Sequence, residues 1–124
     1  MIVGKRTKAH KIYAQKSMAS IKYAINVIKS SRIAPYIHGL YLYGSCARKE
    51  QNYDSDVDLF LVLSPELDRK YYGDDILILK SKVTPPDTSL PEVDLKIEIG
   101  DDWENKTMLY YQNIKKEGIQ LWRI

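Results

Sequence analysis

Two short runs of mostly apolar residues constrain the fold of this chain more than any other feature of its sequence. The first run is Tyr36–Tyr43, which follows Pro35, a residue that ends the helical pattern before it. The second run is Asp56–Leu63, which stops at Ser64. Runs of this length, rich in branched and aromatic side chains and bounded by turn formers, are typical of strands. We therefore expect a small sheet in which the first run is a central strand.

The segments before and after these two strands have patterns that favour helix. Apolar residues recur at three- and four-residue intervals from about Thr7 to Ser31, which predicts a helix. The residues that would form its buried stripe are Ala14, Met18, Ile21, Ile25 and Ile28. The segment Glu66–Val83 fits either a buried strand or a helix, and we expect a helix there.

The last part of the chain predicts one more strand and one more helix. Val93–Ile99 alternates apolar and polar residues, which predicts a strand with one packed face and an open face that carries Asp94. A capping-box pattern begins at Asp101, and Gly118 follows shortly after two lysines, so we expect a helix between them. Together the elements describe a single α/β (α+β) domain over residues 1–124, with helices flanking a small mixed sheet.

The charged residues are unevenly distributed along the chain. Residues 1–49 contain ten Lys or Arg and no Asp or Glu, whereas residues 50–102 contain fourteen acids and five bases. A fold that joins these regions places a positive flank beside a negative pocket, as a site for metal ions and a polyanion requires. The segregation alone is also compatible with solvated helix faces, so it supports such a site without establishing it.

Cysteine content and hydropathy exclude several classes of protein. Cys46 is the only cysteine, so no internal disulfide can form and a cysteine-based zinc site is not expected. No apolar run reaches the roughly 20 residues that span a bilayer, and the amino terminus lacks the apolar core of a signal peptide. We therefore expect a cytoplasmic protein without membrane contact.

Polar residues at the ends of the two predicted strands suggest a site. Asp56 and Asp58 are two residues apart on one strand, so their carboxylates project from the same face about 6.7 Å apart. Such a pair suits Mg²⁺, which prefers a few carboxylates together with substrate phosphates. Gly44 and Ser45 end the preceding strand, where glycine lets a phosphate approach the backbone and a short helix presents free amides. Each feature alone also fits a solvated strand edge or a plain turn.

The combination of these features resembles a known family. The stretch YGSCARKEQNYDSDVDLFLVL, from Tyr43 to Leu63, resembles the motif of the minimal nucleotidyltransferases, a branch of the polymerase beta-like nucleotidyltransferase superfamily. That motif reads GS, any residue, AR, a short polar turn, then SD, an apolar residue and DL. The matching residues are Gly44, Ser45, Ala47, Arg48, Ser55, Asp56, Asp58 and Leu59. Lys49 departs from the motif, because family members commonly have glycine there. The resemblance implies a polymerase beta-like nucleotidyltransferase fold.

The resemblance also implies an activity and the residues that perform it. It implies metal-dependent transfer of a nucleoside monophosphate, expected to be AMP from ATP, with two Mg²⁺ ions and a third carboxylate on a later strand. Asp94 is the preferred third carboxylate, and Glu98 on the same face is its rival. The residues to which the resemblance assigns phosphate binding are Gly44, Ser45 and Arg48, and those to which it assigns metal binding and catalysis are Asp56, Asp58 and Asp94.

The resemblance further implies a protein partner, and two other kinds of function remain open. Minimal nucleotidyltransferases are commonly paired with a small helical HEPN toxin, so an antitoxin role is preferred to modification of a small molecule. Asp94 and Lys96 on one strand also fit the loose pattern of a metal-dependent nuclease. A third reading is a non-catalytic module that binds nucleic acid or an acidic protein through a basic helix edge. That edge consists of Lys8, Lys11, Lys22 and Lys29.

Overall fold

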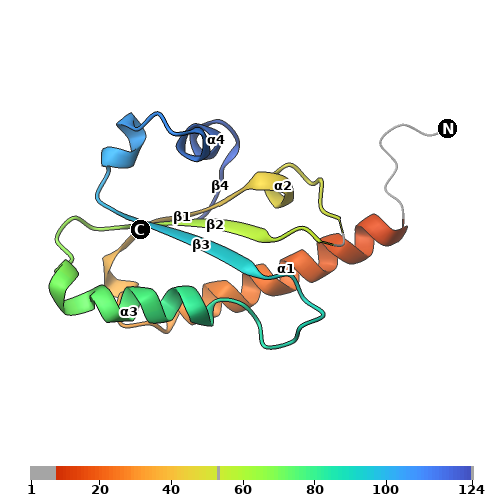
Figure 1. The fold of residues 1–124 in the computed structure, drawn as a ribbon, viewed down its shortest axis with the longest axis horizontal. Helices are drawn as coiled ribbons and strands as arrows, with labels where there is room; N and C mark the ends of the chain where they lie inside the picture. The colour runs from red at the N-terminus through yellow and green to blue at the C-terminus, as the bar shows by residue number, and fades with distance from the viewer. Residues whose placement is uncertain (1–7, 53, 124) are drawn as a thin grey trace.

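The structure is a computed structural model that describes residues 8–52 and 54–123, so Thr7, the predicted start of the first helix, lies outside it. Helices and strands alternate along most of the chain (Figure 1). The helices are α1 (Lys8–Lys29), α2 (Gly44–Ala47), α3 (Arg69–Lys82) and α4 (Leu109–Glu117), with 3₁₀ turns η1 (Ala34–Tyr36) and η2 (Asp102–Asn105). The strands are β1 (Ile37–Tyr43), β2 (Val57–Leu63), β3 (Val93–Ile99) and β4 (Ile119–Arg123).

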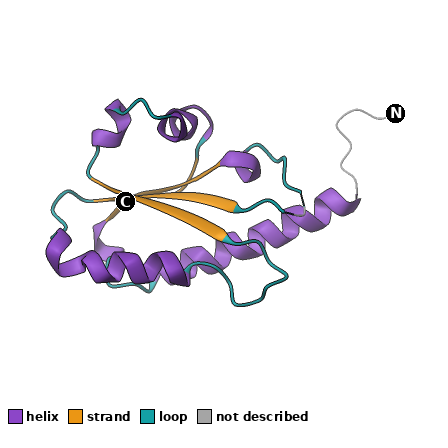
Figure 2. Cartoon of the chain, in the orientation of Figure 1, coloured by secondary structure: helices purple, strands orange, loops and turns teal. Residues whose placement is uncertain are grey.

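The strands form one mixed sheet in the order β3-β2-β1-β4. Strand β1 is antiparallel to both of its neighbours, whereas β2 and β3 are parallel. Helices α1 and α3 cover one face of the sheet, and α2, η2 and α4 lie over the other (Figures 1 and 2). The predicted α/β architecture with a small mixed sheet is therefore confirmed. None of the helices in the described ranges is both long and apolar enough to cross a membrane.

The alternation of side chains along β2 gives the two faces different cores. Leu59, Leu61 and Leu63 point towards α1 and α3 and are fully buried. We call that side the aliphatic face. Phe60 and Val62 point the other way, towards η2 and α4, where the core is rich in rings. We call that side the aromatic face. Its buried residues are Tyr43, Phe60, Val62, Trp103, Tyr111 and Ile114.

Helix α1 packs on the aliphatic face through a stripe that differs in part from the predicted one. Ile21 and Ile28 are buried as predicted, but Met18 is 50 % exposed, so its prediction as a core residue is wrong. The buried stripe is turned towards Ala24 and Ser20 instead. The Ser20 hydroxyl tolerates burial because it donates a hydrogen bond to the carbonyl of Pro91, at 2.8 Å.

Helix α3 occupies the segment whose pattern was ambiguous, and the expectation of a helix there is confirmed. Asp68 caps its amino terminus, because the carboxylate accepts hydrogen bonds from the amides of Lys70 and Tyr71. Only Leu79 of this helix is buried. Helix α3 therefore buries fewer of its side chains in the aliphatic core than α1 does.

The carboxyl-terminal segment contradicts part of the prediction. The expected helix from Asp101 is split into η2 and α4, and the side chain of Asp101 makes no capping hydrogen bond. Burial of Trp103 in the aromatic core accompanies this break in the helix. Gly118 ends α4 as predicted, where an added Cβ would meet the carbonyl oxygen of Ile114 at 2.4 Å. Strand β4 follows at once and was not predicted, because an edge strand of five residues has little pattern of its own.

Candidate active site

Two of the predicted acids lie side by side at one edge of the aromatic face. Asp58 lies in β2 directly between Tyr43 of β1 and Asp94 of β3. Since β2 and β3 are parallel and in register, the Cα atoms of Asp58 and Asp94 are about 5 Å apart and both side chains share one face. Asp56 precedes β2 and is exposed. Val57 and Leu59 on either side of Asp58 are fully buried, so packing holds the strand under the carboxylate.

Electrostatics at this edge disfavour three negative charges without a cation. Burial raises the pKa of the Asp58 carboxyl, the neighbouring Asp94 carboxylate raises it further, and Asp56 adds a smaller effect in the same direction. Lys96 partly offsets the increase. A half-buried carboxyl with a raised pKa beside like charges is typical of catalytic and cation-binding sites.

Lys96 is a member of this cluster whose contact with the acids was not predicted. Its ammonium pairs with the Asp94 carboxylate at 2.9 Å and lies 5.6 Å from the ring centroid of Tyr110. Within the described ranges, no three Asp, Glu, His or Cys side chains are grouped closely enough to hold a metal ion in their present positions. Because Asp94 is paired with Lys96, a cation bound by both carboxylates would compete with that ion pair. The donor set itself, carboxylate oxygens on adjacent strands, has the chemistry that Mg²⁺ prefers.

At position 44, any residue other than glycine would strain the backbone and clash with a neighbouring side chain. Its φ is +74°, in the left-handed region that favours glycine. A Cβ added to Gly44 would lie 2.3 Å from Oδ2 of Asp58. The Gly44 backbone therefore lies against the Asp58 carboxylate, so the predicted phosphate-binding turn and the acid pair are adjacent in space.

A carboxylate from the far end of the chain contacts the predicted phosphate donors. Oε1 of Glu117, in α4, accepts a hydrogen bond from the Gly44 amide at 3.3 Å and pairs with Nη1 of Arg48 at 2.8 Å. Nε of Arg48 also pairs with Glu50, at 2.5 Å. Ser45 lies half-buried in α2 beside these groups. Sequence reasoning missed Glu117, because nothing in its local pattern distinguishes it from any other acid at a helix end.

Asp94 and its predicted rival Glu98 are engaged in different surroundings. Glu98 pairs in register with Val62 rather than with an acid. Its carboxylate accepts a hydrogen bond from the Tyr111 hydroxyl and pairs with Lys106 at 3.1 Å. Glu98 is therefore engaged at the edge of the aromatic core, and the geometry favours Asp94 as the partner of Asp58.

Lys49, which departs from the family motif, has an unusual backbone conformation. Its φ of +59° makes it the one non-glycine residue with positive φ among those that the structure describes. A lysine in this region is strained relative to glycine by about 1 kcal/mol. The turn thus keeps a conformation suited to glycine although the sequence has lysine.

Comparisons with known proteins identify a family and related folds. The profile of the family described as "Polymerase beta, Nucleotidyltransferase" matches residues 24–123. Among curated proteins, none matches the chain. A solved structure described as a candidate nucleotidyltransferase of Sulfolobus solfataricus is 18 % identical, with a TM-score of 0.60, over 98 % of this chain and 93 % of that one.

Two further solved structures are toxin–antitoxin complexes. One, determined with AMP-PNP, is 22 % identical with a TM-score of 0.53 over 83 % of this chain and 73 % of that one. The other, a mutant of the MntA–HpeT toxin–antitoxin, is 20 % identical with a TM-score of 0.50 over 85 % and 73 %. At such identities these likenesses show a shared fold.

Proposed function

Because the chain belongs to the polymerase beta nucleotidyltransferase family, we propose that it transfers a nucleoside monophosphate, AMP from ATP, to an acceptor hydroxyl. The acceptor oxygen forms a bond to the α-phosphorus, the bond from the α-phosphorus to the bridging oxygen breaks, and pyrophosphate leaves. The observation that carries this proposal is the in-register pair of Asp58 and Asp94 beside the close-packed Gly44 backbone.

Asp56, Asp58 and Asp94 are the proposed ligands of two Mg²⁺ ions. Bound there, the ions would neutralise phosphate charge and lower the pKa of the attacking hydroxyl. The raised pKa of Asp58 supports this assignment, because a cation relieves the repulsion that burial and Asp94 impose. Asp94 would either bind a metal ion or, as general base, accept the proton of the attacking hydroxyl. In both roles the ion pair between Asp94 and Lys96 has to break.

Gly44, Ser45 and Arg48 are the proposed contacts of the β and γ phosphates. The Gly44 amide and the Arg48 guanidinium already hold one carboxylate, that of Glu117, so their donors converge on a single anionic group. A triphosphate that binds the same donors has to displace Glu117.

The proposed acceptor is a small helical HEPN-type protein in the cytoplasm, which the chain would neutralise as an antitoxin. Support comes from the shared fold with toxin–antitoxin structures, one of which was determined with AMP-PNP. The family match gives no comparable support to a nuclease activity or to a non-catalytic role.

A transfer assay tests the proposal. The wild-type chain is incubated with Mg²⁺, each α-labelled triphosphate in turn, and a purified HEPN-type protein. Label is expected on the partner, with ATP as the best donor. Asp94→Asn should abolish labelling, whereas the matched control Glu98→Gln should retain it, because Glu98 is engaged at the edge of the aromatic core. Absence of label with every triphosphate, or full activity of Asp94→Asn, contradicts the proposal.

A further inference from the structure

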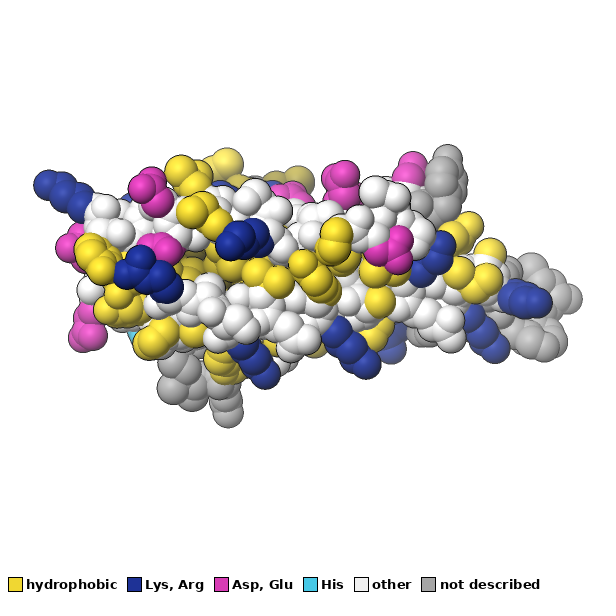
Figure 3. Space-filling model, turned by 90° about the horizontal axis from the view of Figure 1, so that it is seen from below, with side chains coloured by type: hydrophobic (Ala, Val, Ile, Leu, Met, Phe, Trp, Pro, Cys, Tyr) yellow, Lys and Arg dark blue, Asp and Glu magenta, His cyan; other side chains and the backbone are white. Residues whose placement is uncertain are grey.

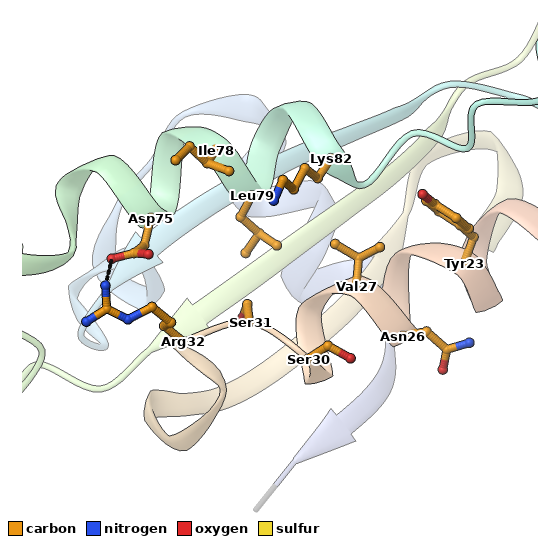
Figure 4. Close-up of a pocket in the computed structure, with 10 residues that line it drawn as sticks. All are labelled: Tyr23, Asn26, Val27, Ser30, Ser31, Arg32, Asp75, Ile78, Leu79 and Lys82. Carbon is orange, nitrogen blue, oxygen red and sulfur yellow. Dashed lines mark ion pairs between the residues drawn. The ribbon is translucent and has the colours of Figure 1, made fainter.

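A groove of about 620 Å³ lies between α1 and α3, on the side of the sheet opposite the acids. Its floor is formed by Val27 and Leu79, and Tyr23 and Ile78 border it (Figure 4). Ile78 is 49 % exposed and Tyr23 is 37 % exposed. The groove is therefore an apolar surface of ligand-binding size, within the range of about 300–1,000 Å³ that is usual for binding sites.

The groove exists because α3 packs loosely on the aliphatic face. Of the 14 residues of α3, only Leu79 is buried. The buried stripe of helix α1, including Ala24 and Ile28, shares one aliphatic core with the sheet and with Leu79 of α3. The facing sides of the two helices thus leave Tyr23 and Ile78 exposed, while Val27 packs only partly against the core.

The helices that border the groove are strongly basic. Helix α1 contains five Lys and no acid, and α3 contains four Lys or Arg and two Asp. Figure 3 shows Lys and Arg side chains on both sides of a band of hydrophobic residues on this face of the molecule. Asp75 at the groove wall is already paired with Arg32, at 3.6 Å, whereas Lys82 has no ion pair among the described residues. The groove thus has an apolar floor and Lys82 in its lining, with the other lysines of the two helices around it; we call these cations the positive rim.

We propose that this groove binds an amphipathic helix of a partner protein whose apolar stripe is flanked by Asp and Glu. From Tyr23 to Ser30 the groove follows α1 and the first residue after it over seven residue steps, or about 10 Å. That length matches two turns of a bound helix, the span of anchors at positions i, i+3, i+4 and i+7. The positive rim complements the acidic flanks and sets the choice of partner.

Two other occupants fit the groove less well. A nucleic acid is held mainly through its phosphates, for which the apolar floor of Val27 and Leu79 offers nothing. A second copy of the chain would bring two basic surfaces together, and like charges across an interface are unfavourable. The chemistry of the rim and the floor together therefore selects an acidic amphipathic helix.

The inference does not depend on the proposed transfer reaction. The groove and the acids lie on opposite faces of the sheet, so binding in the groove requires neither nucleotide nor Mg²⁺. A result against one leaves the other standing.

Binding of a labelled peptide tests the inference. The probe is a helical peptide of about 18 residues with a leucine stripe at the anchor positions and glutamates beside it, and the comparison peptide has lysine in place of each glutamate. Fluorescence anisotropy should show binding of the acidic peptide to the wild-type chain. Affinity for the lysine peptide should be at least about tenfold weaker.

The chain offers matched variants on the same helix. Ile78→Glu and Lys82→Glu alter groove residues, whereas Leu77→Glu and Lys80→Glu alter exposed α3 residues that do not line the groove. The groove variants should weaken peptide binding at least about tenfold, and the controls less than about threefold. All four positions are exposed, so thermal unfolding should show that the variants remain folded.

Several outcomes would overturn the inference. These are no binding of the acidic peptide, equal binding of the lysine peptide, or equal losses in the groove and control variants. A DNA or RNA duplex that binds and is released by Ile78→Glu would instead assign the groove to nucleic acid. If sedimentation shows that the wild-type chain is a dimer and that Ile78→Glu is a monomer, the groove would be assigned to a second copy of the chain.

Discussion

The two faces of the sheet share the same strands and yet differ in how completely their side chains are packed and paired. On the aliphatic face, Val57, Leu59 and Leu61 are fully buried under helices. On the aromatic face, the buried Phe60 of β2 is followed two residues away by Asp58, which is charged and half-buried. One strand thus supplies a rigid core on one side and a charged site on the other.

This difference shows that the fold places repulsion between like charges at the edge of the aromatic face. Phe60 is in edge-on contact with Trp103 within the aromatic core, with ring centroids 4.9 Å apart. Beyond it, Asp58 and Asp94 are adjacent like charges, and Lys96 is the only cation paired with them among the described residues. The repulsion is tolerated because the backbone beneath is fixed by aliphatic packing.

The largest expected effect comes from removing the Asp58 charge. Asp58→Asn should lower nucleotidyl transfer at least about a hundredfold, on the order of the loss when a preorganised polar group is removed from an active site. The matched control Asp54→Asn changes an exposed acid of the preceding turn and should keep activity. Transfer of labelled AMP measures both, and equal activity of the two variants would contradict the assignment of the site.

The same substitution should raise stability. The pKa of Asp58 is raised above its ordinary value of 3.8, so the ionised carboxyl destabilises the fold at pH values above its folded-state pKa. That destabilisation disappears as the pH falls below 3.8, since the carboxyl is then protonated in both states. Asp58→Asn should therefore melt at a higher temperature than wild type at pH 7 and at nearly the same temperature at pH 3. A lower melting temperature at pH 7 would sink this account.

A second pair of variants compares glycines on the two faces. Gly44→Ala should destabilise the chain by about 2 kcal/mol, because of its φ of +74° and the contact of the new Cβ with Asp58. Gly73→Ala in α3 should stabilise it by about 0.5–1 kcal/mol, because nothing lies within 4 Å of the added Cβ. Urea unfolding measures both, and effects of the same sign would show that the faces do not differ as described.

Glu117 provides a smaller test of the site. Its carboxylate occupies the Gly44 amide and Arg48, so Glu117→Gln should tighten binding of AMP-PNP roughly three- to tenfold by removing a competing negative charge. Glu104→Gln, on the exposed side of η2, is the control and should leave affinity unchanged. Titration calorimetry with Mg²⁺ gives the affinities. Weaker binding by Glu117→Gln would mean that Glu117 positions Arg48 for the nucleotide instead of competing with it.

The smallest expected effect is at Lys49. Lys49→Gly should stabilise the chain by about 0.5 kcal/mol, because relief of the strained φ outweighs the added freedom of glycine in the unfolded state. Lys49→Ala serves as the control, since alanine removes the side chain and keeps the strain. Urea unfolding should place Gly above Ala in stability, and the reverse order would contradict the argument.

Much of the fold could be predicted from the sequence because the responsible signals are local. The alternation over Val93–Ile99 predicted β3 to the residue, and Gly118 marked the end of α4. Predictions that depended on distant packing were wrong: Met18 is exposed, and the helix expected from Asp101 is broken so that Trp103 can enter the aromatic core. Such outcomes depend on which surface arrives opposite a segment, and its own residues do not specify that.

The candidate site likewise has features that the local sequence predicted and features that depend on strand pairing. The spacing of Gly44, Asp56 and Asp58 was readable because a motif of this kind is short and lies in one stretch of chain. The sequence preferred Asp94 as the third carboxylate but kept Glu98 as a rival, since both alternate to the same face. Strand register decides their surroundings: Asp94 is opposite Asp58, and Glu98 is opposite Val62.

By itself, then, the sequence determined the order of most elements, the family and the acids that share a strand, because hydrophobic periodicity and short motifs act over a few residues. Only the tertiary structure decided that Glu117 contacts Gly44, that Lys96 pairs with Asp94, and that α1 and α3 leave a groove between them. The physical reason is that these contacts depend on how helices and strands far apart in the chain dock on the sheet, and local side-chain preferences do not determine that geometry.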